Sequence, residues 1–142
     1  MRIKDVMRGK ASQTIFTVKP DDTVALLLDV LAEHNIGAVV VSEDGRAVAG
    51  IISERDVVRH LGGNRDLVNA SISSIMTTDV YTCGPDMDVA ELAQRMTEGR
   101  FRHIPVVVDD AMVGLVSIGD VVKWRLSELQ SERDHLAGYI SQ

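Results

Sequence analysis

Apolar positions in the first half of the chain follow two different periods. Four of them recur at helical spacing with polar residues between them, which predicts a helix through Val24, Leu27, Leu28 and Leu31. Three short apolar runs, at 15–18, 37–41 and 48–52, predict strands, and a turn at Asp44-Gly45 joins the last two as a hairpin. A second helix starts at Ser53, so the predicted order is strand, helix, strand, strand, helix.

The second half of the chain repeats the first. A shift of 65 positions, and of 64 after one deleted residue, matches polar as well as apolar positions: Pro20 with Pro85, Ser53 with Ser117, and Asp56 with Asp120. Chance matches between two valine-rich segments rarely include polar positions in register. Two copies of one unit are expected to pack against each other, because each alone leaves an apolar face exposed.

The duplication divides the chain into three segments. Residues 1–65 hold the first repeat and the start of a linker, residues 66–126 hold the second repeat, and residues 127–142 continue as a charged helical extension. The elements of the second repeat are predicted as strands at 80–83, 104–108 and 113–116, with a helix at 89–97 and another from 118 onward. A short segment upstream of each repeat, 3–7 and 72–76, ends in Met in both copies.

Both repeats end in one signature, which stands as Gly50-Ile51-Ile52-Ser53-Glu54-Arg55-Asp56 and as Gly114-Leu115-Val116-Ser117-Ile118-Gly119-Asp120. With the order of elements and the strand entry Arg102-His103-Ile104-Pro105-Val106, it resembles the CBS domain, the module named after cystathionine β-synthase. The resemblance implies an α+β fold, a tandem CBS-domain pair of two β-α-β-β-α repeats related by a pseudo-twofold axis, plus the C-terminal helix. It also implies adenosyl ligands bound in clefts between the repeats, and a disc-like homodimer.

The Ser-x-x-Asp part of the signature lies where a strand ends and a helix begins. The first free N–H groups of a helix favour an anion, and a carboxylate one turn in can accept hydrogen bonds from both hydroxyls of a ribose. Asp56 and Asp120 are therefore candidate ribose ligands, with Ser53 and Ser117 beside them for phosphate or ribose. In the structural alternative, Ser only caps the helix and Asp only complements its dipole; the two roles are compatible.

Basic residues distinguish the two implied clefts. Arg102 and His103 align with Gly37 and Ala38, and family geometry places the basic pair of one repeat opposite the Ser-x-x-Asp of the other. The first cleft is therefore expected to take a phosphorylated ligand, because Arg matches phosphate through its planar fork. Its candidate nucleotide-binding residues are Ser53, Arg55, Asp56, Val80, Tyr81, Arg102, His103 and Ile104. The alternative for Arg102 is an exposed ion pair with Glu98 or Asp109.

The second cleft faces small residues instead of a basic pair. Its candidates are Ile15, Phe16, Gly37, Ala38, Ser117 and Asp120. This cleft is expected to be empty, or to take a neutral adenosyl group or the far half of a dinucleotide. Aromatic residues make up only 4% of the chain, so adenine would lie mainly against aliphatic side chains. Val80 and Tyr81, like Ile15 and Phe16, can equally be core residues.

Composition and charge restrict the remaining classes of function. The formal net charge of -6 argues against a wide basic surface for duplex nucleic acid. No apolar run approaches the roughly 20 residues that span a bilayer, and residues 1–7 do not read as a secretory signal. The single cysteine, Cys83, is expected to be a small core residue. These features predict a cytoplasmic protein without a membrane contact.

The sequence offers no pattern for catalysis. The four histidines, His34, His60, His103 and His135, lack zinc-ligand spacing, and no phosphate-binding glycine loop or nucleophile elbow is present. We therefore expect no metal and no catalytic cofactor. The predicted function is a regulatory module that binds AMP, ADP, ATP or NAD and signals to an unidentified effector protein. The alternatives are a ligand-independent interaction or oligomerisation module, and an enzyme that acts on a bound nucleotide.

The C-terminal helix carries apolar residues at steps of four and three: Val122, Leu126, Leu129, Leu136 and Ile140, with Arg133 interrupting. This spacing approximates a heptad pattern over a short length. The helix could cover the edge of the module, pair with a second subunit, or remain a surface helix.

Overall fold

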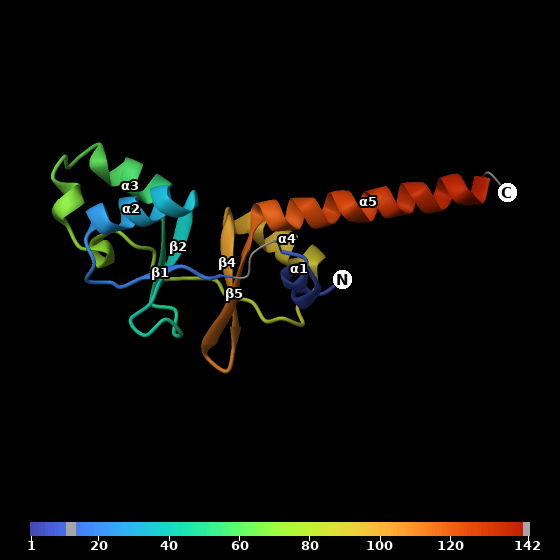
Figure 1. The fold of residues 1–142 in the computed structure, drawn as a ribbon, viewed down its shortest axis with the longest axis horizontal. Helices are drawn as coiled ribbons and strands as arrows, with labels where there is room; N and C mark the ends of the chain where they lie inside the picture. Colours follow the sequence, from blue (N-terminus) through green and yellow to red (C-terminus); the bar gives the residue numbers. More distant parts are fainter. Residues whose placement is uncertain (11–13, 141–142) are drawn as a thin grey trace.

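The structure, a computed structural model, describes residues 1–10 and 14–140 (Figure 1). The elements of the first repeat are β1 (Thr17–Val18), α2 (Val24–His34), β2 (Ala38–Val41), β3 (Gly50–Ser53) and α3 (Glu54–Leu61). Those of the second repeat are α4 (Val89–Gly99), β4 (His103–Val108), β5 (Ala111–Ser117) and α5 (Ile118–Ile140). Helix α1 (Ile3–Arg8) precedes the first repeat, and two 3-10 turns, η1 (Leu67–Asn69) and η2 (Ile72–Ser74), lie between the repeats.

The first repeat forms a three-stranded sheet in the order β1-β2-β3, with β1 parallel and β3 antiparallel to the central β2. All four residues of β2 are buried, as the continuous apolar run predicts. Thr23 caps α2 by accepting a hydrogen bond from the backbone N–H of Leu26 at 3.2 Å. Asn35 ends α2 in the left-handed conformation, which is common at the C-terminus of a helix.

The second repeat keeps the β4–β5 hairpin, but the predicted strand at 80–83 is wrong. Only Cys83 pairs with β4: its N–H donates to the carbonyl of Pro105 at 3.0 Å, and its own carbonyl accepts from Val107 at 2.8 Å. Gly84 and Pro85 follow at once, and proline has no N–H with which to continue the ladder. The second sheet therefore has two strands and one isolated bridge.

Each repeat completes its core with a segment from the other half of the chain. In α1, Ile3 is fully buried in the core of the second repeat, and its N–H donates to Met87 at 2.9 Å. In η2, Ile72 is fully buried in the core of the first repeat, and its N–H donates to Asp22 at 2.8 Å. This exchange explains why 3–7 and 72–76 resemble each other, and it makes the two repeats one interlocked unit.

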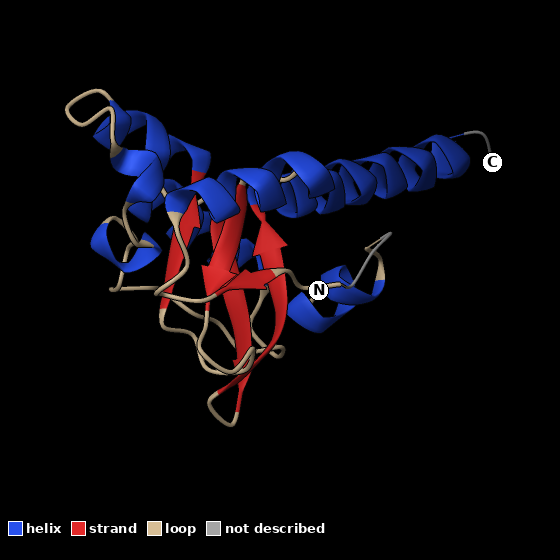
Figure 2. Cartoon of the chain, turned by 60° about the vertical axis from the view of Figure 1, so that its left-hand side comes forward, coloured by secondary structure: helices blue, strands red, loops and turns tan. Residues whose placement is uncertain are grey.

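The strands of the two repeats lie side by side, and α2, α3 and α5 lie toward one end of them (Figures 1 and 2). The hairpins of the two repeats also touch directly, since the N–H of Met112 donates to the carbonyl of Arg46 at 2.7 Å. Helix α5 continues far beyond the rest of the molecule (Figure 1). No helix in the described part of the chain is both long and apolar enough to cross a membrane.

Candidate functional site

Both Ser-x-x-Asp signatures fold into the same helix cap. In the first repeat the Asp56 carboxylate accepts from the N–H of Ser53 at 2.9 Å, and the Ser53 hydroxyl accepts from the N–H of Asp56 at 3.3 Å. In the second repeat the corresponding distances between Ser117 and Asp120 are 2.8 and 3.2 Å. The capping role considered for these residues is thus confirmed. It fixes each carboxylate beside the start of a helix.

Gly37 of the first repeat and Arg102 of the second occupy equivalent places in the structure, as the alignment of the two repeats indicates. The carbonyl of Gly37 accepts from the N–H of Glu54 at 2.9 Å, at the start of α3. The carbonyl of Arg102 accepts from the N–H of Ile118 at 2.8 Å, at the start of α5. The two residues therefore occupy equivalent places, one at each helix entry. The difference between glycine and arginine makes the two helix entries unequal in size and charge.

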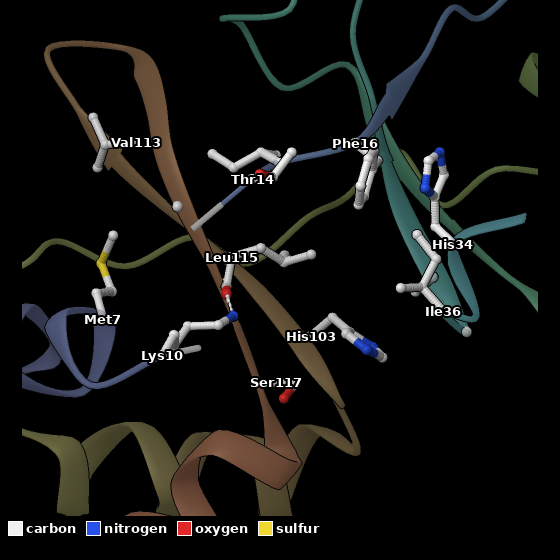
Figure 3. A pocket seen from close by; sticks show the side chains of 14 residues that line it. Met7, Lys10, Thr14, Phe16, His34, Ile36, His103, Val113, Leu115 and Ser117 are labelled. Carbon is white, nitrogen blue, oxygen red and sulfur yellow. Dashed lines mark hydrogen bonds between the residues drawn. The ribbon is translucent and has the colours of Figure 1, made fainter. Parts of the chain in front are cut away.

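A cavity of about 560 Å³ lies between the two repeats (Figure 3). Five of the six residues assigned to the second cleft line it together: Ile15, Phe16, Gly37, Ala38 and Ser117. The sixth, Asp120, lies one helical turn beyond Ser117 and is bonded to its N–H. Gly37 and Ala38 come from the first repeat and Ser117 from the second, so closure of the repeats assembles this cavity.

Lys10 lines this cavity too, and the sequence did not indicate that it would. Its ammonium donates to the carbonyl of Leu115 at 2.7 Å and lies 3.0 Å from the carboxylate of Asp120. Both side chains are largely covered, with exposed fractions of 27% and 21%. Burial raises the pKa of Asp120, but the N–H of Ser117 and the ammonium of Lys10 outweigh it and hold the pKa below its ordinary value. Asp120 is therefore ionised at neutral pH.

His103 lines this same cavity, whereas the sequence assigned it to the first cleft. The reason is the hairpin register, which places His103 directly opposite Ser117 on the neighbouring strand. Burial lowers the pKa of His103, and the charges of Lys10 and Arg102 lower it further, against the opposing effect of Asp120. His103 is therefore mostly neutral at pH 7 and protonates only in more acidic solution.

The far wall of the cavity is apolar and aromatic. Phe16 stacks on the imidazole of His34, with ring centroids 3.8 Å apart, and Ile36 lies beside them (Figure 3). One end of the cavity thus offers cationic and hydrogen-bonding groups and the other offers a flat apolar surface. This division suits a ligand with a charged end and a planar ring.

The residues assigned to the first cleft do not come together in the same way. Ile104 is fully buried in the core of the second repeat, so its side chain cannot reach a cleft. Tyr81 stacks on Phe101 at 5.9 Å, and Arg95 lies 5.7 Å above its ring. Val80 is half-buried, and Arg55 and Arg102 are exposed. Among the described residues, no hydrogen bond or ion pair joins Arg102 to Ser53 or Asp56.

Comparison with known proteins agrees with this architecture. The CBS domain model matches the chain twice, over residues 3–63 and 72–127. The chain belongs to the CBS-domain family. The CBS domain-containing protein CBSX3, mitochondrial, of Arabidopsis thaliana is 39% identical over 146 residues, which cover 97% of this chain and 71% of that protein.

Solved CBS-domain structures superpose on this CBS pair. The CBS-domain protein ATU1752 of Agrobacterium tumefaciens is 39% identical with a TM-score of 0.82, and the match covers 88% of this chain and 99% of that one. The CBS-domain pair of protein MJ0100 is 26% identical with a TM-score of 0.76, and the match covers 87% and 98%. That pair was solved in complex with 5'-methylthioadenosine and S-adenosyl-L-methionine. The predicted family and fold are therefore confirmed, and the chain is a CBS-domain pair, a regulatory module.

Proposed function

We propose that this CBS pair binds an adenosine-containing ligand in the second cleft and signals its occupancy to a partner protein. The observation that carries the proposal is the cavity shared by both repeats, with Ser117, Asp120 and Lys10 gathered at one end. Its volume, about 560 Å³, falls within the range typical of small-molecule sites. The adenosyl ligands of the similar MJ0100 pair support the same class of ligand.

The chemistry of the cavity suggests how such a ligand lies. Asp120 is ionised and accepts from the ribose hydroxyls, while the adenine packs near Phe16 and Ile36. Lys10, with His103 when it is protonated, attracts a phosphate. We therefore propose the second cleft for the phosphorylated ligand, in place of the first, because Lys10 and His103 both line the cavity between the repeats.

The site also lies directly at the start of α5. Ser117 and Asp120 form the cap of α5, so a ligand that bonds to them acts on the first turn of the longest helix. Ligand binding can shift a conformational equilibrium only by its difference in affinity for the two states. We propose that the ligand changes the position of α5 relative to the first repeat, and that the effector protein recognises this change.

Thermal unfolding with AMP, ATP, NAD and S-adenosylmethionine tests the proposal. A ligand at about 100 times its dissociation constant stabilises the fold by about 2.7 kcal/mol. The decisive variant is Asp120→Asn, and Asp56→Asn is its matched control. The two carboxylates make the same hydrogen bond in the two repeats, since each accepts from the N–H of the serine that caps its helix. We expect Asp120→Asn to abolish the ligand response and Asp56→Asn to retain it. An unchanged response in Asp120→Asn would overturn the assignment of the site.

Two other functions make different predictions in the same assay. A ligand-independent interaction or oligomerisation module shows no stabilisation by any of the four ligands. An enzyme that acts on a bound nucleotide converts the ligand, which chromatography of the incubated ligand detects. The disc-like homodimer, the effector protein and the cytoplasmic location stay predictions.

A further inference from the structure

The half-buried side chain of His103 lines the cavity between the repeats (Figure 3). It stands at the start of β4, directly opposite Ser117 in β5, and so lies close to the cap of α5. No hydrogen bond or ion pair joins its imidazole to another described residue. Both ring nitrogens are therefore available to a ligand in the cavity.

The imidazole of His103 offers a ligand two different states. The neutral ring has one N–H donor and one acceptor, whereas the protonated ring has two donors and a positive charge. A phosphate is anionic and only accepts hydrogen bonds, so it gains much more from the protonated ring. An uncharged adenosyl ligand gains little from the added charge. The protonation state of His103 therefore separates these two kinds of ligand.

Burial and the nearby charges decide how readily His103 protonates in the absence of a ligand. Burial has the largest effect and lowers the pKa of His103 below its ordinary value. The carboxylate of Asp120 opposes this, while the charges of Lys10 and Arg102 add to it. The ring is therefore mostly neutral near pH 7 until a further negative charge arrives.

Two other titratable groups lie on the side of the cavity that the first repeat supplies. His34, in the last turn of α2, lines the cavity, where it stacks on Phe16. The carboxylate of Glu54, at the start of α3, lies beside Gly37 in the cavity wall. His34 is the one of these two that titrates in the same range of pH as His103, so an experiment must distinguish the two histidines.

A bound phosphate supplies the missing negative charge. Lys10 cannot neutralise it fully, because its ammonium already pairs with Asp120 at 3.0 Å. An anion within about 4–6 Å of a histidine strengthens proton binding by about tenfold or more. The coupling is reciprocal, so the proton strengthens phosphate binding by the same factor.

The inference that follows rests on the proposed function and adds a condition to it. We propose that His103 makes the second cleft a proton-dependent site, which binds a phosphorylated adenosyl ligand more tightly in acidic solution and an uncharged one equally well at both acidic and neutral pH. In the first repeat the position opposite Ser53 is Ala38, which has no titratable group. The second repeat thus gives the module a response to nucleotide and acidity together.

Isothermal titration of the full chain with AMP and adenosine tests the proposal at about pH 7.5 and about pH 5.5, on either side of the range in which histidine titrates. On acidification we expect AMP affinity to rise about tenfold in wild type relative to His103→Gln. A phosphate monoester itself titrates at about pH 6, and the variant supplies that baseline because it meets the same ligand. Adenosine should show no such difference. Equal pH dependence of AMP binding in the two proteins overturns the proposal.

Two further measurements separate the alternatives. His34→Gln removes the other histidine of the cavity and should keep the pH dependence of wild type, whatever it does to the affinity itself. A dependence lost in His34→Gln and kept in His103→Gln would show that the wrong histidine was chosen. NMR titration of the wild-type imidazoles needs no variant: AMP should raise the pKa of His103, and adenosine should not. If neither ligand binds at any pH, the proposed function fails; if both bind and AMP leaves the His103 titration unchanged, only this inference fails.

Discussion

Replacing Lys10 by methionine removes one charge from the cavity and keeps most of the side-chain volume. In the folded protein the Lys10 ammonium bonds to the Leu115 carbonyl at 2.7 Å and pairs with Asp120 at 3.0 Å. The variant therefore leaves Asp120 with the N–H of Ser117 but without its cation. Two effects follow, one on stability and one on the choice of ligand.

The size of the stability effect follows from how far the pair is covered. A hydrogen bond to a charged group contributes about 1.5–3 kcal/mol, while fully exposed ion pairs contribute about 0–1 kcal/mol. Lys10 and Asp120 are 27% and 21% exposed, so we expect Lys10→Met to lower the free energy of unfolding by about 1–2 kcal/mol. For a domain of this size, this loss lowers the midpoint of thermal unfolding by about 3–6 °C. Lys19→Met, at an exposed lysine, serves as the control.

The effect on ligands is more specific. If Lys10 attracts a phosphate, Lys10→Met should raise the dissociation constant of AMP about tenfold, which corresponds to about 1.4 kcal/mol of binding free energy. Adenosine should bind as well as before or better, because its ribose no longer competes with Lys10 for Asp120. Isothermal titration of both ligands against wild type and variant measures the ratio directly. An equal loss for AMP and adenosine would refute the argument, since it would show that Lys10 only maintains the shape of the site.

Three further predictions concern titration and packing. Because burial lowers the pKa of His103, the folded state favours the neutral ring. The wild-type protein should therefore lose stability relative to His103→Gln as the pH falls from about 7 to about 5. Urea unfolding of both proteins measures this difference. Burial raises the pKa of Cys83 to about 11, so the thiol should react with a disulfide reagent at pH 8 only after unfolding. Gly50→Ala should cost about 1–3 kcal/mol, because the new Cβ would lie 2.8 Å from the backbone oxygen of Thr77. Gly114→Ala, whose new Cβ meets only the flexible end of a methionine, should cost less in the same calorimetric measurement.

Local patterns made the repeat and most of its elements predictable. Helical spacing, capping residues and turn residues act over a few positions, so α2, the Ser117–Asp120 cap and the β2–β3 hairpin could be read directly. The strand expected at 80–83 failed because a run of β-favouring residues says nothing about whether a neighbouring strand offers partners. Only Cys83 pairs with a neighbouring strand, and the pairing ends at Gly84-Pro85.

The sequence by itself determined the duplication, the α+β order of elements and the capped carboxylates Asp56 and Asp120, because each of these depends on neighbours along the chain. Only the tertiary structure decided which groups share a cavity. Lys10 lies 105 positions from Leu115, to which it bonds, and His103 enters the second cleft through the register of a hairpin. Such contacts form only when the two repeats exchange their first segments and pack against each other. Patterns over a few neighbouring residues do not predict how the repeats pack.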